Sequence, residues 1–304
     1  MKPIKFLILG FFLTLSINTV NAQSNRDWWN SLSPAWKGVF QEQELKGKNV
    51  TPNDEQLVRI VQITHIDCSN NKDVKNLKPL SKLSFLEEIR CENTNIESLE
   101  GIENLANLRV IDCSDNDNIN SLIPLSNNLN LEEIDCSNTM VKNLAPLVSL
   151  KKLTKLDVHL CTVNKLVQIG SLTSLITLDV SQNRPLYDIN GIEKLTNLVE
   201  FNMSETRVKD LKPLKKLKNL KVLNLADTPV ETLREIQDLT ELTEIDFSNT
   251  QISSASLDYL YGHMSYKMLR ARNIEVSKDD IEAFTSFYKQ KNPNAIVIMT
   301  IKKE

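Results

Sequence analysis

The sequence repeats itself with a period of 22 or 23 residues over most of its length. An apolar residue opens each of nine units, which we number 1 to 9 in chain order: Ile66, Ile89, Ile111, Ile134, Leu156, Leu178, Phe201, Leu223 and Ile245. Two positions later stand Cys68, Cys91, Cys113, Cys136, Val158, Val180, Met203, Leu225 and Phe247. Apolar residues two positions apart indicate one buried face of a β-strand. One such unit cannot bury its own apolar edge, so the repeat predicts a continuous stack of units.

The remainder of each unit carries a second apolar pattern. A third apolar residue precedes the opening residue by three positions and is Leu in every unit after the first. The segment before it follows the pattern of Leu77-Lys78-Pro79-Leu80, and proline excludes a long α-helix there, so short helical turns are expected. Asn128 stands where the other units place a buried Leu, so we expect a rearranged turn in unit 3.

This pattern resembles the leucine-rich repeat family and, within it, the internalin-like class with 22-residue units. The resemblance covers roughly residues 57–276, where a degenerate tenth unit fits Tyr266, Leu269, Ala271 and Val276. It implies an α/β fold, a right-handed solenoid with a curved parallel β-sheet on its concave face and short helical turns on its convex face. An open solenoid also needs a cap at each end of its core.

Both ends of the repeat contain candidate caps. Trp29, Trp36 and Phe40 are spaced for one face of a single helix, and a second helix is expected to start near Asn53. A helix with an apolar stripe is expected after Ser277, followed by an edge strand at residues 296–298. A partner-binding patch is the alternative reading of these aromatic residues.

The first residues have the three parts of a secretory signal peptide. Lys2 and Lys5 precede an apolar run that is too short to span a bilayer, and Val20-Asn21-Ala22 fits a cleavage site. A buried N-terminal helix is the alternative. The expected organisation is a signal peptide at 1–22, a helical cap at 23–56, nine repeats at 57–252, and the tenth repeat with an α/β cap at 253–304. Without a transmembrane segment, the mature chain should be periplasmic, associated with the cell surface, or secreted.

The outward-facing strand positions are strongly acidic. Residues before, between and after the two buried strand positions number 27 in nine units and include eleven acids and two bases, a charge of −9. The mature chain as a whole, with 34 Lys and Arg against 39 acids, carries −5. The candidate partner-binding residues are Asp67, Arg90, Asp112, Asp135, Asp157, His159, Asp179, Asn202, Asn224 and Asp246.

Two interpretations of this acidic row stay open. It could attract a basic protein partner or a hard cation such as Ca²⁺. It could equally be a solvated polar ladder, since Asp-x-Ser is common in the family without a specific ligand. No aromatic residue occupies the 27 positions, so a tight interface would involve the rims near Tyr187 or the C-terminal tyrosines.

Other chemistry finds little support. Cys68, Cys91, Cys113 and Cys136 share one buried position and should form a stack of free thiols, with Cys161 packed nearby. No cofactor motif, zinc-type cysteine pair or glycine-rich phosphate loop occurs.

His159 lies near two aspartates but lacks a nucleophile, so no enzyme is expected. The lysine-rich segment at 207–221 should lie on the convex helical turn and its flanks, where it is either a solvated face or a contact for anionic glycan or lipid. The overall charge excludes a general nucleic-acid binder. We therefore expect a non-catalytic exported scaffold that binds another macromolecule, most directly a protein; the alternative is a structural or adhesive component of the cell envelope.

Overall fold

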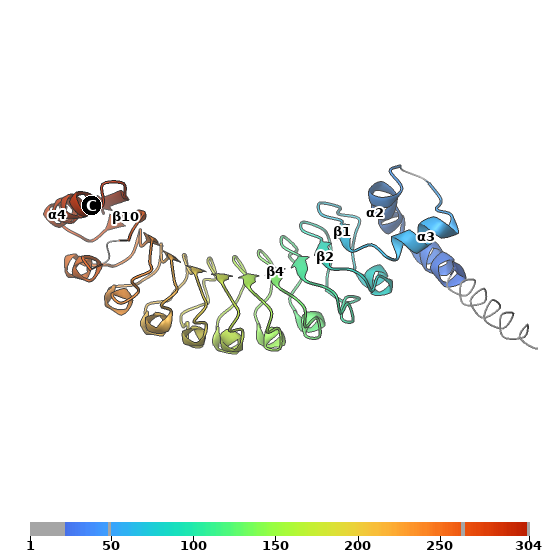
Figure 1. The fold of residues 1–304 in the computed structure, drawn as a ribbon, viewed down its shortest axis with the longest axis horizontal. Helices are drawn as coiled ribbons and strands as arrows, with labels where there is room; N and C mark the ends of the chain where they lie inside the picture. The colour runs from blue at the N-terminus through green and yellow to red at the C-terminus, as the bar shows by residue number, and fades with distance from the viewer. Residues whose placement is uncertain (1–21, 48–49, 263–264, 303–304) are drawn as a thin grey trace, which may run out of the picture.

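The chain forms one curved solenoid with all of its strands on the concave side (Figure 1). This computed structural model describes residues 22–47, 50–262 and 265–302. An eleven-stranded sheet runs through the solenoid in chain order, and every pairing in it is parallel. The predicted fold class is confirmed. The signal peptide predicted at 1–22 lies outside the described residues, apart from Ala22.

The sheet consists of nine short strands and two longer ones. In each short strand the middle residue is the opening residue of its unit, buried between two more exposed neighbours. The strands are β1 (His65–Asp67), β2 (Glu88–Arg90), β3 (Val110–Asp112), β4 (Glu133–Asp135), β5 (Lys155–Asp157), β6 (Thr177–Asp179), β7 (Glu200–Asn202), β8 (Val222–Asn224), β9 (Glu244–Asp246), β10 (Met268–Ile274) and β11 (Ile296–Ile301).

Short 3-10 helices return the chain along the convex side, as the proline pattern predicts. Apart from Ile123, which is exposed, their leucines and isoleucines join the strand residues in one continuous apolar core. The 3-10 helices are η1 (Lys78–Lys82), η2 (Ile123–Leu125), η3 (Ala145–Leu147), η4 (Val167–Ser171), η5 (Ile192–Lys194), η6 (Lys212–Lys216), η7 (Arg234–Ile236) and η8 (Ser254–Leu260).

The rearranged turn expected at Asn128 is wrong. The carbonyl of Asn128 accepts from the N–H of the residue three positions later, as the carbonyl of Leu105 does in the preceding unit, so the two backbones make the same turn. The buried side-chain amide donates to the carbonyls of Ile102 and Leu105, at 2.9 and 3.0 Å. A polar side chain fits the leucine position because the backbone of the preceding unit presents acceptors to it there.

In all ten units the residue four positions after the opening residue has positive φ, and we call these the left-handed turn residues. The threonine that follows in five of the ten units is buried and donates its hydroxyl to the carbonyl three residues back, as Thr139 does to Cys136. Units 3 and 6, with 23 residues, place Asn116 and Asn183 there instead. Each amide reaches carbonyls of its own unit and of the preceding one, so the asparagine bridges two units across the longer turn.

The cysteine stack takes the predicted form. All five cysteines are free and buried, and Cys68, Cys91, Cys113 and Cys136 follow one another on the core side of successive strands. Cys68, Cys91 and Cys113 each lie 3.3–3.5 Å from the carbonyl oxygen of the neighbouring strand, in the geometry of a weak thiol donor. Cys161 contacts Thr139 and Cys136 in the same layer.

The N-terminal cap contains two helices where the aromatic spacing predicts one. Residues 22–31 are helical, and α2 (Pro34–Glu44) starts anew because Ser33 caps it and Pro34 occupies its first turn. Trp29 therefore lies on a different helix from Trp36 and Phe40, yet both indole rings pack around Phe40, at centroid distances of 6.5 and 5.6 Å.

Two indole N–H groups attach this cap to the first unit. Trp28 donates to the carbonyl of Pro79, and Trp36 donates to that of Asn76. The second predicted helix is α3 (Asp54–Ile60), which begins after Asn53 with a complete capping box and crosses the expected domain boundary at residue 57. The buried rings and these bonds close the N-terminal end of the core.

The C-terminal cap contains the predicted helix and edge strand. Helix α4 (Lys278–Lys291) starts after Ser277, whose hydroxyl accepts from the backbone N–H of Asp280. Phe284 and Tyr288 of α4 are fully buried and pack against Tyr261 and Tyr266, respectively. β11 follows and pairs with β10, so it extends from the expected 296–298 to Ile301.

Candidate protein-binding surface

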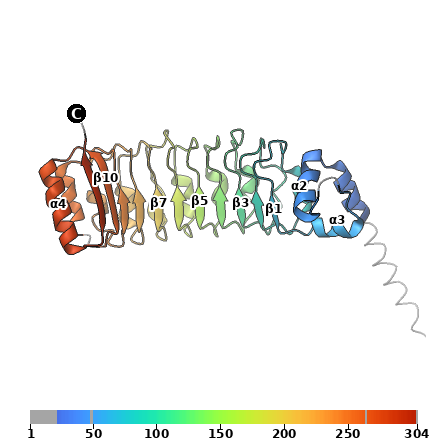
Figure 2. The same cartoon turned by 90° about the horizontal axis from the view of Figure 1, so that it is seen from above.

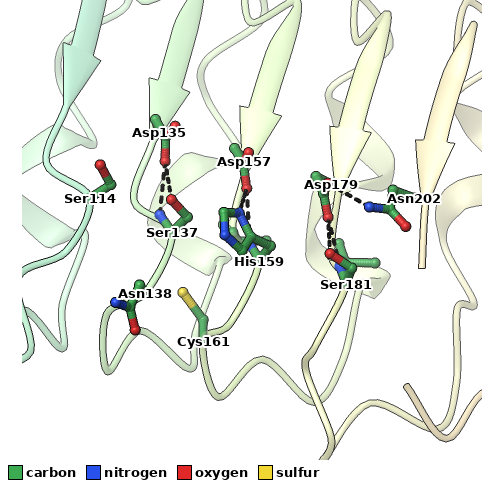
Figure 3. Close-up of polar contacts among 12 residues, drawn as sticks. Ser114, Asp135, Ser137, Asn138, Asp157, His159, Cys161, Asp179, Ser181 and Asn202 are labelled. Carbon is green, nitrogen blue, oxygen red and sulfur yellow. Dashed lines mark hydrogen bonds and ion pairs between the residues drawn. The ribbon is translucent and has the colours of Figure 1, made fainter. Parts of the chain in front are cut away.

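The sheet register brings the predicted acidic residues into one row across the concave face. Asp112, Asp135, Asp157 and Asp179 are direct neighbours on β3 to β6, and we call these four the acidic ladder. Strands in a sheet lie about 4.8 Å apart, so the ladder places four carboxylates within a short distance. Figure 3 shows three of these side chains on adjacent strands.

The row continues beyond the ladder on both sides. Towards the N-terminus it contains Arg90 and Asp67, and towards the C-terminus it contains Asn202, Asn224 and Asp246, so every predicted residue of this row lies on one line of the floor. Arg270 on β10 is the next neighbour of Asp246 and ends the acidic character.

Each ladder carboxylate also closes the turn at the end of its own strand. In Asp112, Asp135 and Asp179, Oδ1 accepts from the backbone N–H and from the hydroxyl of the serine two residues on, at 2.6–3.1 Å. Asn202 and Asn224 make the same bond to the backbone, so the turn needs an oxygen acceptor and not a charge. The aspartate charge is therefore an addition to the structural role of this position.

His159 occupies the place of that serine in unit 5. Its backbone N–H and ring Nδ1 both approach Oδ1 of Asp157, at 2.9 and 2.8 Å (Figure 3). Burial alone would lower the pKa of His159, but the hydrogen bond that its ring donates to Asp157 and the charges of the surrounding aspartates raise it above the ordinary 6.5. Burial also raises the pKa of Asp157, and Asp135 and Asp179 add to that shift.

Arg90 compensates an acid outside the ladder. Its guanidinium pairs with Glu88 on its own strand rather than with the ladder, and that hydrogen bond raises the pKa of Arg90. Asp112 and Asp135 share a small hollow with two bases, Arg90 and Lys155, and Lys155 lies 3.9 Å from the carboxylate of Glu133. His159 pairs with Asp157, and Asn202 donates its amide to Oδ2 of Asp179. Within the described part of the floor, Asp112, Asp135 and Asp179 have no ion pair.

A larger hollow of about 490 Å³ lies where the N-terminal cap meets the floor. Asp67, Arg90 and Glu92 line it together with Gln43 of α2. Gln43 also bonds to both the carbonyl of His65 and the N–H of Asp67, so the cap shields the open edge of β1. Sequence periodicity gave no indication of this hollow, because the residues that form it come from the cap and from units 1 and 2.

The lysine-rich convex segment is partly neutralised. Lys209, Lys212 and Lys215 lie 2.6–3.5 Å from the carboxylates of Glu231, Asp210 and Glu235. This arrangement favours the solvated-face interpretation over a site for anionic glycan or lipid.

The described ranges contain neither a cluster of metal ligands nor a membrane-spanning helix. Between residues 22 and 302, within those ranges, no group of three or more His, Cys, Asp or Glu side chains is placed to hold a metal ion. None of the helices described there combines the length and the hydropathy of a membrane span.

Solved structures share this fold, whereas neither the protein-family models nor the curated proteins give a match. The internalin InlF from Listeria monocytogenes aligns over 88% of this chain and 90% of its own, with 19% identity and a TM-score of 0.65. InlJ from the same organism, whose functional domain includes a cysteine ladder, aligns over 91% of this chain and 61% of its own, with 17% identity and a TM-score of 0.71. The plant peptide hormone receptor RGFR1, in complex with RGF2, aligns over 80% and 38%, with 15% identity and a TM-score of 0.58. The chain thus has the fold of internalins and other leucine-rich repeat proteins.

Proposed function

We propose that this protein is a non-catalytic, exported binding scaffold whose acidic concave face recognises a basic surface of another protein. The observation that carries the proposal is the acidic ladder. The turn requires only one oxygen acceptor from each ladder residue, and Asn202 and Asn224 supply it without charge. Four adjacent carboxylates on the floor therefore add mutual repulsion, on the order of 1 kcal/mol per pair in water, which the fold does not need.

A cationic partner would relieve this repulsion on binding. Opposite charge lowers the free energy of the ladder, speeds the encounter and makes the affinity sensitive to salt. The parallel with RGFR1, a receptor of the same fold in complex with RGF2, supports recognition of a polypeptide. The lysines of the convex segment are less suited to bind an anionic ligand than the acidic ladder is to bind a cationic one, because Lys209 and Lys215 already pair with acids.

The experiment removes charge and keeps the turn. Purified mature protein (residues 23–304) is crosslinked to envelope and culture fractions, in parallel with a variant carrying Asp112→Asn, Asp135→Asn and Asp157→Asn. Asparagine already fills this position in units 7 and 8, so the fold should persist. The control variant carries Asp73→Asn, Glu97→Gln and Glu241→Gln, three exposed acids outside the floor, and has the same net charge.

The expected result is a discrete crosslinked protein that the parent and the control capture and the floor variant does not. Capture should also weaken between low and physiological ionic strength. Equal capture by all three proteins, or capture that ignores salt, would contradict the acidic floor as the binding site. Co-sedimentation with envelope material without a discrete partner would instead favour the structural or adhesive role.

A further inference from the structure

Unit 5 departs from the other units at the turn that follows its strand. His159-Leu160-Cys161 stands where unit 4 has Ser137-Asn138-Thr139 and unit 9 has Ser248-Asn249-Thr250. Leu160 is the left-handed turn residue, with φ +50°, and the other nine units place Asn, Asp, Gln or Glu there. Positive φ disfavours a bulky side chain, and the Leu160 side chain is 45% exposed. The turn therefore presents an apolar group to solvent in a backbone conformation that does not suit it.

The neighbouring polar residues bond to one another along this row and leave Leu160 out. Asn93 donates to Asn70, Asn138 to Asp115, and Gln182 to Glu205. The backbone of unit 5 still keeps the common register, since Leu160 donates its N–H to the carbonyl of Ser181. An asparagine would fit the same backbone, so the fold does not require leucine here.

Exposed apolar residues also occur in the loops of the two units next to unit 5. Each strand is followed by a loop that contains the left-handed turn residue. We call the line of these loops the flank, and it forms one long edge of the molecule in Figure 2. Met140 in the loop of unit 4 is 54% exposed, and Tyr187 in the loop of unit 6 is 61% exposed, next to exposed Pro185. The apolar part of the flank thus spans units 4 to 6 and is centred on unit 5.

Charged residues border this apolar patch with opposite signs. The flank of unit 3 contains Asp115 and Asp117, a charge of −2. In the flank of unit 7, Glu205 accepts from Gln182, and Lys209 and Asp210 pair with Glu231 and Lys212, which leaves the positive charge of Arg207. The side chains of Asp117 and Arg207 are exposed, and neither has a hydrogen bond or ion pair to another residue of the described ranges. Acidic and basic borders therefore lie two units to either side of Leu160.

We infer that the flank is a self-complementary surface on which a second copy of this chain docks. A two-fold axis through Leu160, running from the concave to the convex side, places unit 3 of one copy against unit 7 of the other, and unit 4 against unit 6. The two Leu160 side chains meet on the axis, and Met140 faces the loop of Pro185 and Tyr187. Asp117 faces Arg207 twice, once on each side of the axis, as an isologous interface requires.

The same axis leaves both concave faces open and pointing in one direction. The paired arcs lie side by side in opposite orientations, and neither acidic floor is covered. The dimer and the binding of a partner on the floor are therefore independent. Burial of the apolar patch on docking also removes the exposed side chains for which a monomer has no use.

The test measures the mass of the mature protein by sedimentation velocity over a wide range of concentration. Leu160→Asn restores the residue that the backbone prefers, so it should keep the fold and weaken the dimer by about tenfold or more. Arg207→Asp should weaken it similarly. The double variant Asp117→Arg with Arg207→Asp exchanges the two partners and should restore the dimer.

The charge exchange makes the result specific to this interface. A dimer that forms in the parent, weakens in both single variants and returns in the double variant supports the proposal. A parent that stays monomeric throughout overturns it, as does a dimer that Leu160→Asn leaves intact. The proposal would also be overturned if Arg207→Asp and the double variant sedimented with equal mass, because units 3 and 7 would then not face each other. The Phe85→Ser variant, which removes an exposed apolar residue away from the flank, is the control and should dimerise like the parent.

Discussion

Asn116 should contribute more to stability than any exposed polar residue of its turn. Its side chain is 1% exposed and makes five hydrogen bonds. Nδ2 donates to the carbonyls of Cys91, Cys113 and Ser114, and Oδ1 accepts from the backbone N–H and the hydroxyl of Thr94. Asn116→Ala removes the bridge between units 2 and 3 in a single step.

The magnitude follows from the groups that lose their partners. A buried donor or acceptor left unsatisfied costs about 1–3 kcal/mol. The N–H of Thr94 and the carbonyl of Cys113 are the two backbone groups that depend most directly on this amide, whereas the carbonyl of Cys91 keeps the hydroxyl of Thr94 as a donor. Water can reach part of the space that alanine leaves. We therefore expect Asn116→Ala to lower the free energy of unfolding by about 3 kcal/mol. Urea unfolding followed by circular dichroism would measure it.

Asn118→Ala is the matched control for this change. Asn118 is the same residue type two positions along the same turn, but its side chain is exposed, so its loss should change stability by less than about 0.5 kcal/mol. Asn183→Ala, at the equivalent position in unit 6, should resemble Asn116→Ala. Equal unfolding curves for Asn116→Ala and Asn118→Ala would refute the reasoning.

Three further outcomes are expected. Burial raises the pKa of the Cys113 thiol well above its ordinary value, so a thiol reagent should label none of the cysteine stack rapidly until urea unfolds the chain. An NMR titration should place the pKa of His159 above 6.5, and Asp157→Asn should lower it. Because folding raises this pKa, the interaction stabilises the fold fully below about pH 6.5 and is lost as the pH rises through the raised value. Asn128→Leu removes a buried Oδ1 that has no hydrogen-bond partner, so it should raise the free energy of unfolding by about 1 kcal/mol. The midpoint of urea unfolding should rise accordingly, and an unchanged midpoint would contradict this.

The sheet and the acidic floor could be predicted because both follow from the alternation of side chains along a strand. Once Ile134 and Cys136 are placed in the core, Asp135 must point outward, and the fixed period aligns it with Asp157. The cysteine stack follows from the same rule. These features depend on which face a residue occupies and not on the details of its contacts.

Features that depend on particular hydrogen bonds could not be read from the period. The amide of Asn128 finds two carbonyls at a leucine position, which only the stacked backbone reveals. The aromatic spacing suggested one N-terminal helix because Trp29 and Trp36 are seven residues apart, close to two full turns. Ser33-Pro34 contained the signal for a new helix start, and it competed with that periodicity. Arg90 pairs with Glu88 because the two side chains share one face of the same strand.

The hydrogen bonds of Asn116 join residues of adjacent units, so the chain can fold one unit at a time. Each unit needs little besides its two neighbours, because its hydrogen bonds either stay within the unit or reach one period along the chain. A chain that emerges amino terminus first from an export channel could fold its units in sequence order, beginning on the aromatic residues of the N-terminal cap around Phe40. Assembly would then proceed in one direction and finish only when Tyr288 covers the last coil.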